Sequence, residues 1–239
     1  QQTQNIGRTT FLESNSSLSG ISYIFSTLLV FPLGKQNLHF YSAYAPEATI
    51  NSRNNEIFTS LSSSSSGIGQ QLEVDLEPSG LDETVLILPT ATTLGLGIGT
   101  RKKWFLGGQF VSTSNSDFRN DFITLGGLSY EDGNRLSLGG FFIPNYSSLT
   151  SYWKRIVYRV GYYNEKTGIR VQQSSLKNRG ITFGVGLPSF RLGPFSNANL
   201  GVTLGSRSTS NPNLVDENYW HVKLGFSLND VWFIKRKYN

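Results

Sequence analysis

The chain has 239 residues, of which 15% are charged and 13% are aromatic, and it contains 25 glycines and no cysteine. Soluble domains carry about 25% charged residues, so this composition is typical of a transmembrane β-barrel, with a soluble β-sandwich or a Ser/Asn-rich adhesin as the alternative. The absence of cysteine excludes disulfides and a cysteine-linked lipid anchor. The net charge is +5, and the basic residues are scattered along the chain, which argues against a nucleic-acid partner.

The first 80 residues predict one hairpin. Residues 1–19 are polar and turn-rich. Residues 20–31 form an apolar run that is too short for a membrane helix, and its β-branched and aromatic content predicts a strand. Residues 37–45 are expected to be its antiparallel partner. Residues 47–80 contain a run of five serines and few large apolar side chains, which predicts a long, weakly ordered loop or two weak strands.

From residue 81 onward, apolar and small polar residues alternate, which is the pattern of strands with two different faces. The alternation predicts about ten to twelve strands joined as sequential hairpins. The fold class is therefore all-β, a transmembrane antiparallel up-and-down β-barrel that forms a single domain over residues 1–239. Clear strands are expected at 94–98, 104–111, 122–130, 135–143, 152–163, 169–173, 181–187, 199–205 and 220–228.

The two parities of these strands predict a lipid face and a lumen face. Ile181, Phe183 and Val185 alternate with small residues, so the apolar parity is expected to face lipid. Glycines gather on the other parity, where they either leave room for a lumen or relieve crowding in a curved sheet. Arg155 and Arg159 are the candidate lumen-facing charges. They would pair with acids or contact an anionic headgroup.

Aromatic residues near the strand ends are candidates for the membrane interface, where amphipathic rings are enriched. These are Tyr152, Trp153, Tyr162, Tyr163, Trp220 and Trp232. The stretch from Trp220 to Leu228 is an amphipathic strand of about the length that crosses a bilayer. A turn at Asn229-Asp230 follows it.

The sequence offers no catalytic or metal constellation. His39 and His221 have neither a carboxylate nor a second histidine at useful spacing. The glycine-rich run from Gly95 to Gly99 sits inside an alternating strand and does not open a helix, as a phosphate loop would. We therefore expect no enzyme activity and no cofactor or metal, although bound lipid or detergent is compatible with the pattern.

Several strings, in this order, resemble the Bacteroidetes outer-membrane proteins related to the long-chain fatty-acid transporter family. The likeness covers about residue 81 to the end. The strings are LPTATTLGLGIG, KWFLGG, GGFFIPNY, YRVGYY, GITFGVGLP and the C-terminal GFSLNDVWFIKRKY. The most specific part of the pattern comprises Ser227, Leu228, Asn229, Asp230, Trp232, Phe233, Lys235, Arg236 and Lys237.

The resemblance implies an outer-membrane barrel of about fourteen strands with an N-terminal hatch inside it. No hatch segment is recognisable, so we expect either a chain that is partial on its N-terminal side or a smaller barrel. The implied function is the passage or binding of hydrophobic small molecules. The alternative is a non-transporting subunit of an outer-membrane protein secretion or assembly complex. The expected partners are outer-membrane lipid and other outer-membrane proteins, with no nucleic acid.

Overall fold

The computed structural model describes residues 8–62, 71–122, 127–189, 196–209, 211 and 216–227, which form almost only antiparallel strands. No helix within these ranges is long and apolar enough to span a membrane. The chain divides into two compact units. Unit 1 comprises Gln1–Tyr23, Ala45–Thr90 and Ser116–Gly126, and unit 2 comprises Ile24–Tyr44, Ala91–Asn115 and Gly127–Asn239.

Unit 1 is built on a long two-stranded ribbon. Strand β1 (Arg8–Gly20) pairs along its whole length with β4 (Ala48–Ser62). Strands β5 (Gln71–Val74) and β6 (Glu83–Leu88) also pair with β4, and β9 (Arg119–Asn120) pairs with β6. Two short 3-10 helices, η1 (Glu77–Ser79) and η2 (Asn115–Asp117), lie in the connecting segments.

The expectation of a long loop over residues 47–80 was wrong, because β4 and β5 occupy much of this stretch, as in the two-strand alternative. The polar start of the chain also contains a strand, β1. Both errors have the same cause. The β1–β4 ribbon carries polar and apolar residues on both faces, so its sequence lacks the period-two alternation of a half-buried strand.

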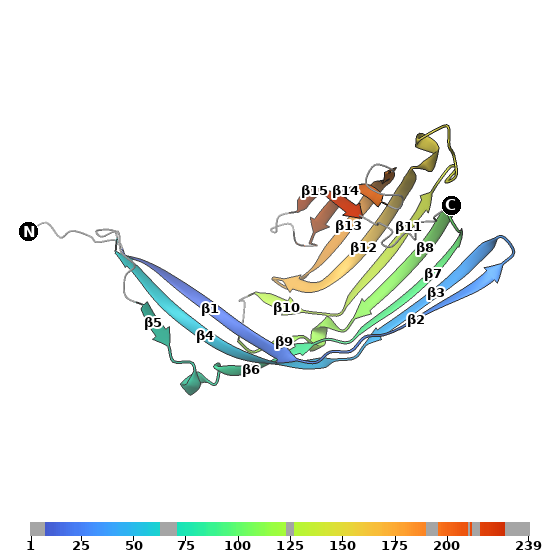
Figure 1. Cartoon of the computed structure of the whole chain (residues 1–239). Coiled ribbons are helices and arrows are strands. Elements are labelled where there is room, and N and C mark those ends of the chain that lie inside the picture. The colour runs from blue at the N-terminus through green and yellow to red at the C-terminus, as the bar shows by residue number, and fades with distance from the viewer. Residues whose placement is uncertain are drawn as a thin grey trace, which may run out of the picture. The chain divides into compact units, whose positions relative to one another are not determined.

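Unit 2 is a ten-stranded sheet in which nine strands follow one path and β10 (Leu128–Tyr130) pairs with β12. The path is an up-and-down meander, visible in Figure 1 as the curved sheet that ends in the red strands. In order, its strands are β2 (Phe25–Leu33), β3 (Gln36–Ala45), β7 (Ala91–Thr100), β8 (Trp104–Thr113), β11 (Gly133–Phe142), β12 (Val157–Val171), β13 (Ser174–Ser189), β14 (Ser196–Ser208) and β15 (Glu217–Ser227).

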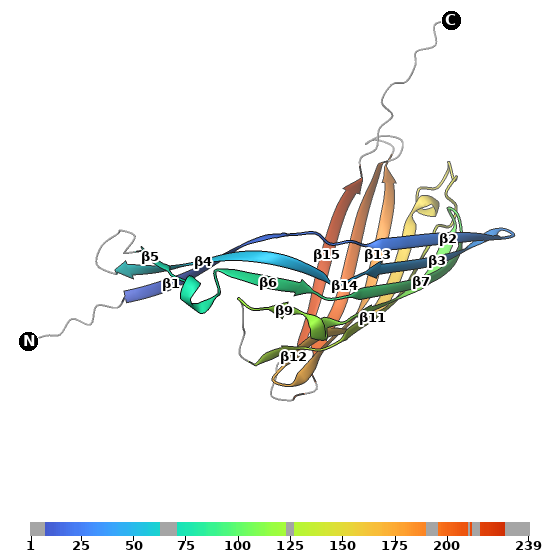
Figure 2. The same ribbon diagram turned by 90° about the horizontal axis from the view of Figure 1, so that it is seen from below.

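Connections leave this sheet at two ends. End A carries the β2–β3 turn, the β7–β8 turn and the β11–β12 connection, which contains the 3-10 helix η3 (Trp153–Arg155). End B carries the β8–β11, β12–β13 and β14–β15 connections. Figure 2 shows the unit 2 strands from the perpendicular direction.

Three strand predictions in unit 2 differ from the structure. The strand expected at 122–130 is reduced to β10 among the described residues. The strand expected from Tyr152 starts only at Val157, because η3 precedes it. Residues 169–173 are not a separate strand: β12 continues through the expected turn with a register shift between Lys166 and Arg170, and the chain reverses at Gln172-Gln173. Such a bulge lets a strand bend without ending.

Candidate functional site

The register of β12 to β15 separates an apolar face from a polar face. Tyr162, Ile181, Leu204 and Trp220 are consecutive cross-strand partners, and all four are exposed. Their chain neighbours form the matching row of cross-strand partners on the other face: Tyr163, Gly180, Gly205 and Tyr219. The predicted two-faced pattern is therefore present, and the polar face is the candidate site.

Large side chains on the polar face lie flat against glycines of the same or the neighbouring strand. A Cβ on Gly97 would overlap the ring of Phe105, and one on Gly107 would lie 2.9 Å from that ring. Likewise, a Cβ on Gly180 would lie 2.6 Å from the Tyr163 hydroxyl. Of the two explanations for the glycines, relief of crowding describes these positions, because the space above them is filled by aromatic rings.

Two tyrosines and an asparagine join three strands of this face. The hydroxyls of Tyr163 and Tyr219 are 2.5 Å apart, and Tyr219 also donates to Asn178 Oδ1 at 2.7 Å. The guanidinium of Arg135 lies 4.9 Å from the centre of the Tyr163 ring. Buried hydroxyls need such partners, so the cluster ties β12, β13 and β15 together and fixes the direction of their side chains.

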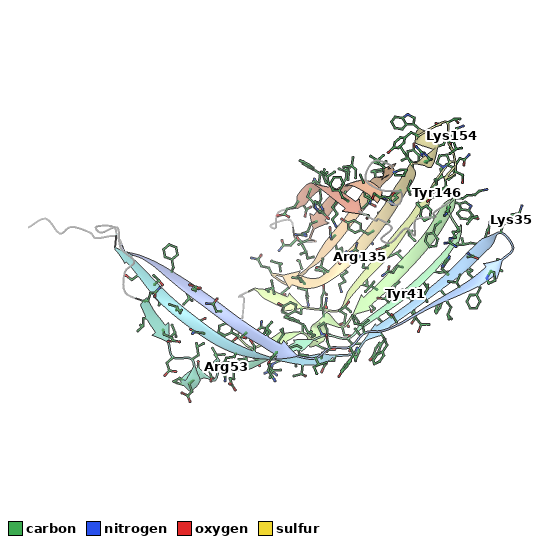
Figure 3. All side chains as sticks on the ribbon, viewed as in Figure 1. Lys35, Tyr41, Arg53, Arg135, Tyr146 and Lys154 are labelled. Carbon is green, nitrogen blue, oxygen red and sulfur yellow. The ribbon has the colours of Figure 1, made fainter. Side chains whose placement is uncertain are left out.

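An open pocket of about 600 Å³ lies over the polar face. Its walls include His39 and Phe105, whose ring centres lie 5.6 Å apart, and the guanidinium groups of Arg135 and Arg159. Tyr41 and Arg135, labelled in Figure 3, both line it. The lining of the pocket is therefore mostly apolar, with two guanidinium groups at its wall.

Of the two predicted lumen charges, only Arg159 lies on this polar face. Its Nη1 donates to Asn199 Oδ1 at 2.9 Å, and its side chain lies close to Gly186. Arg155 belongs instead to η3 at end A, where its guanidinium lies 5.3 Å from the centre of the Tyr152 ring. The sequence placed Arg155 in a strand because the apolar pattern of β12 continues back across this helix.

The predicted interface aromatics fall into different places. Tyr152 and Trp153 form an edge-to-face pair on η3 and are exposed at end A, while Tyr162 and Trp220 lie on the apolar face. The prediction that Tyr163 lies at the membrane interface was wrong. Tyr163 is buried on the polar face, because neighbouring residues of a strand point to opposite sides. Trp232 lies outside the described residues, as does the C-terminal signature except Ser227, which ends β15.

Sequence reasoning missed the pocket residues Phe105 and Arg135 and the cluster residues Asn178 and Tyr219. Their parity could have indicated the polar face. Which glycine each large side chain covers depends on strand register, which single-strand patterns do not specify. Among the described residues, no group of three or more His, Asp or Glu could hold a metal ion.

One partly exposed ion pair at end B predicts a pH dependence. Lys166 Nζ lies 2.9 Å from Glu131 Oε2. Burial raises the pKa of Glu131, but the Ser175 hydroxyl and the Lys166 ammonium outweigh it and hold the pKa below its usual value. When folding lowers the pKa of a carboxyl group, its ionised form stabilises the folded state at pH values above the unfolded-state pKa. This stabilisation is lost as the pH falls through the folded-state pKa.

We expect Lys166→Gln to destabilise unit 2 by up to about 1 kcal/mol at pH 7, because the pair is partly exposed. The difference from the unmodified chain should shrink as the pH falls below the ordinary glutamate pKa of about 4.3 and through the lowered pKa of Glu131. Urea unfolding at pH 7 and at pH 3 measures the difference in stability between the variant and the unmodified chain. An equal difference at both pH values would show that Lys166 acts through packing instead.

A meander of antiparallel strands with one apolar and one polar face is the pattern of the outer-membrane proteins that cross the bilayer with strands. Within that class, the family model of BamG matches residues 1–239, and the chain belongs to the BamG family, a family of the bacterial outer membrane. The predicted localisation in the bacterial outer membrane is thus confirmed. No comparison supports the finer resemblance to fatty-acid transporters.

Neither the curated proteins nor the solved structures contain a match to this chain.

Proposed function

We propose that the protein is a non-transporting subunit of an outer-membrane protein assembly complex. The observation that carries this proposal is the BamG family match over the whole chain. In this role, unit 2 provides the membrane-embedded part and unit 1 provides a surface for protein partners. The passage of hydrophobic compounds, the other function considered from the sequence, has no comparable support.

The composition of unit 1 supports a partner-binding role. In its described part, only Ala48 and Leu76 are buried apolar side chains, while Phe11, Leu12 and Leu18 of β1 are exposed. A sheet of this size needs an apolar face covered by something to be stable on its own. Unit 1 therefore presents apolar side chains that a partner protein would cover.

A polar network gives unit 1 a defined shape despite its small core. The side-chain Nδ2 of Asn54 donates to the Leu81 carbonyl at 2.8 Å and to Thr84 Oγ1 at 2.9 Å. Its Oδ1 accepts from Ser52 at 2.7 Å and from Ser16 at 2.8 Å. Because every hydrogen-bonding position of this buried amide is used, the network joins β1, β4 and β6 in one arrangement. A preformed surface loses less entropy when a partner binds.

Purification from native outer membranes tests the proposal. We expect the tagged full chain, extracted in mild detergent, to retain other outer-membrane proteins in fixed ratio. Leu12→Asp should reduce this retention at least tenfold, since Leu12 and its cross-strand partner Phe58 form an exposed apolar pair. Burying an unpaired carboxylate in such a contact costs about 1–3 kcal/mol or more.

Ser17→Asp adds the same charge to the same strand on the opposite face, across from Arg53, and serves as the matched control. It should leave partner retention unchanged. A chain that purifies alone with a bound hydrophobic compound, and whose depletion leaves the abundance of other barrel proteins unaltered, would refute the assembly role and favour transport.

A further inference from the structure

The basic residues of unit 2 are unevenly distributed along the strands. End A exposes Lys35 in the β2–β3 turn, Arg101, Lys102 and Lys103 in the β7–β8 turn, and Lys154 in η3. These five residues are called the basic rim. Figure 3 shows Lys35, Tyr146 and Lys154 at this end of the strands. Residues 24–44, 91–115 and 133–164, which build the rim and its strands, contain no Asp or Glu.

End B has a different charge pattern. Glu131, Asp132, Glu165, Asp216 and Glu217 all lie in the half of unit 2 toward this end, where they are mixed with basic residues. The Lys166–Glu131 ion pair is one result of that mixing. Because the rim segments have no carboxylate of their own, the anions that neutralise the rim must come from outside these segments.

Aromatic side chains accompany the rim. The Lys102 ammonium lies 4.5 Å from the centre of the Tyr146 ring, and Trp153 of η3 is 71% exposed. Backbone hydrogen bonds hold these connections together, with Ile143 N donating to Lys103 O and Asn145 N to Lys154 O, both at 2.7 Å. Exposed Trp and Tyr beside Lys and Arg are typical of chains that lie at a bilayer surface.

Lys102 adopts a backbone conformation that glycine would adopt without strain. Its φ is +61°, in the left-handed region that is disfavoured for a residue with a side chain. The corresponding position of the end B turn, Gln173, has a similar φ of +67° but a neutral side chain. Lys102 therefore exposes a charged side chain at a position where glycine would be less strained.

We propose that the basic rim binds the headgroups of anionic phospholipids in the periplasmic leaflet of the outer membrane, with Lys102 as a direct contact. The side follows from the balance of the connections, since short turns lie on the periplasmic side of such proteins. End A has the short turns Gly34-Lys35 and Arg101–Lys103 beside the longer β11–β12 connection, whereas among the described connections of end B only the β12–β13 turn is as short. The headgroup follows from charge complementarity, since each Lys or Arg near an anionic surface favours binding.

Lipid binding to the full chain in neutral detergent tests this proposal. Native mass spectrometry gives the affinity for phosphatidylglycerol relative to phosphatidylcholine. We expect a preference for phosphatidylglycerol that weakens with added salt. Lys102→Gly should lower this preference about fivefold without lowering the unfolding temperature, because glycine relieves the strained φ. Arg101→Gln, Lys102→Gly and Lys103→Gln together should lower it about a hundredfold.

Gln173→Gly is the matched control, since it relieves a similar φ at end B without changing the charge. It should leave the lipid preference unchanged. The proposal fails if Lys102→Gly keeps the full preference, or if Gln173→Gly lowers it as much. A preference for lipid A over phosphatidylglycerol would overturn the assigned headgroup and side. Equal binding of the zwitterionic and anionic lipids would leave the rim as a surface for something other than lipid charge, which also refutes the proposal.

Discussion

Val202→Arg will largely abolish insertion of the chain into the outer membrane, whereas Thr203→Arg will insert normally. Val202 lies in the middle of β14 on the apolar face, where its cross-strand partners are Phe183 and Val222. An arginine facing lipid at the bilayer midplane costs about 2–4 kcal/mol, which corresponds to a thirtyfold or larger loss of inserted protein. Thr203 lies on the polar face between Thr182 and His221, where a charge can remain hydrated.

The two variants add the same side chain to neighbouring positions of one strand, so a general effect of arginine on folding is controlled. The measurement is the fraction of chain that is membrane-inserted and heat-modifiable on gels. Equal insertion of both variants would show that the apolar face does not contact lipid. Failure of Thr203→Arg alone would mean that the two faces are assigned the wrong way round.

Gly97→Ala will destabilise unit 2 by about 1–3 kcal/mol, although alanine ordinarily stabilises a strand relative to glycine. The added Cβ would overlap the ring of Phe105, which lies across β7 and β8 on the polar face. The ring must therefore leave its position and lose its contacts with His39 and Phe141, whose ring centres lie 5.6 Å and 6.1 Å away. The midpoint of urea unfolding in lipid vesicles measures the change.

Gly201→Ala is the control on the same face, because its Cβ would meet nothing closer than the Phe183 carbonyl oxygen at 3.8 Å. It should be neutral or slightly stabilising. In a Phe105→Ala background, Gly97→Ala should cost almost nothing, since the ring that it displaces is gone. A full penalty in that background would mean that backbone contacts, and not the ring, exclude a side chain at residue 97.

The sequence predicted the parts of the fold in which one face is apolar and the other polar. Ile181, Phe183 and Val185 lie on one face of β13 as expected, because a strand with two different environments must alternate. The same rule fails for β1 and β4, whose faces are alike. Alternation also cannot tell a strand from the short helix η3, because an apolar pattern three residues long fits both.

The candidate site was less predictable than the fold. The parity of Arg159 correctly indicated the polar face, but Tyr163 was grouped with Tyr162 because both are aromatic. The hydrogen bonds from Tyr163 to Tyr219 and from Tyr219 to Asn178 join residues far apart in the sequence. Such contacts follow from which strands pair and in what register, and this information is distributed over the whole sheet.

The nine-strand path of unit 2 has a directional consequence. Consecutive strands alternate in direction, and nine is odd, so β2 and β15 at the two margins of the path run the same way. β2 and β15 therefore cannot pair with each other in the antiparallel way used throughout the path. A strand running from end A to end B would fit both of them. Closure of this sheet into a uniformly antiparallel ring therefore requires an odd number of additional strands.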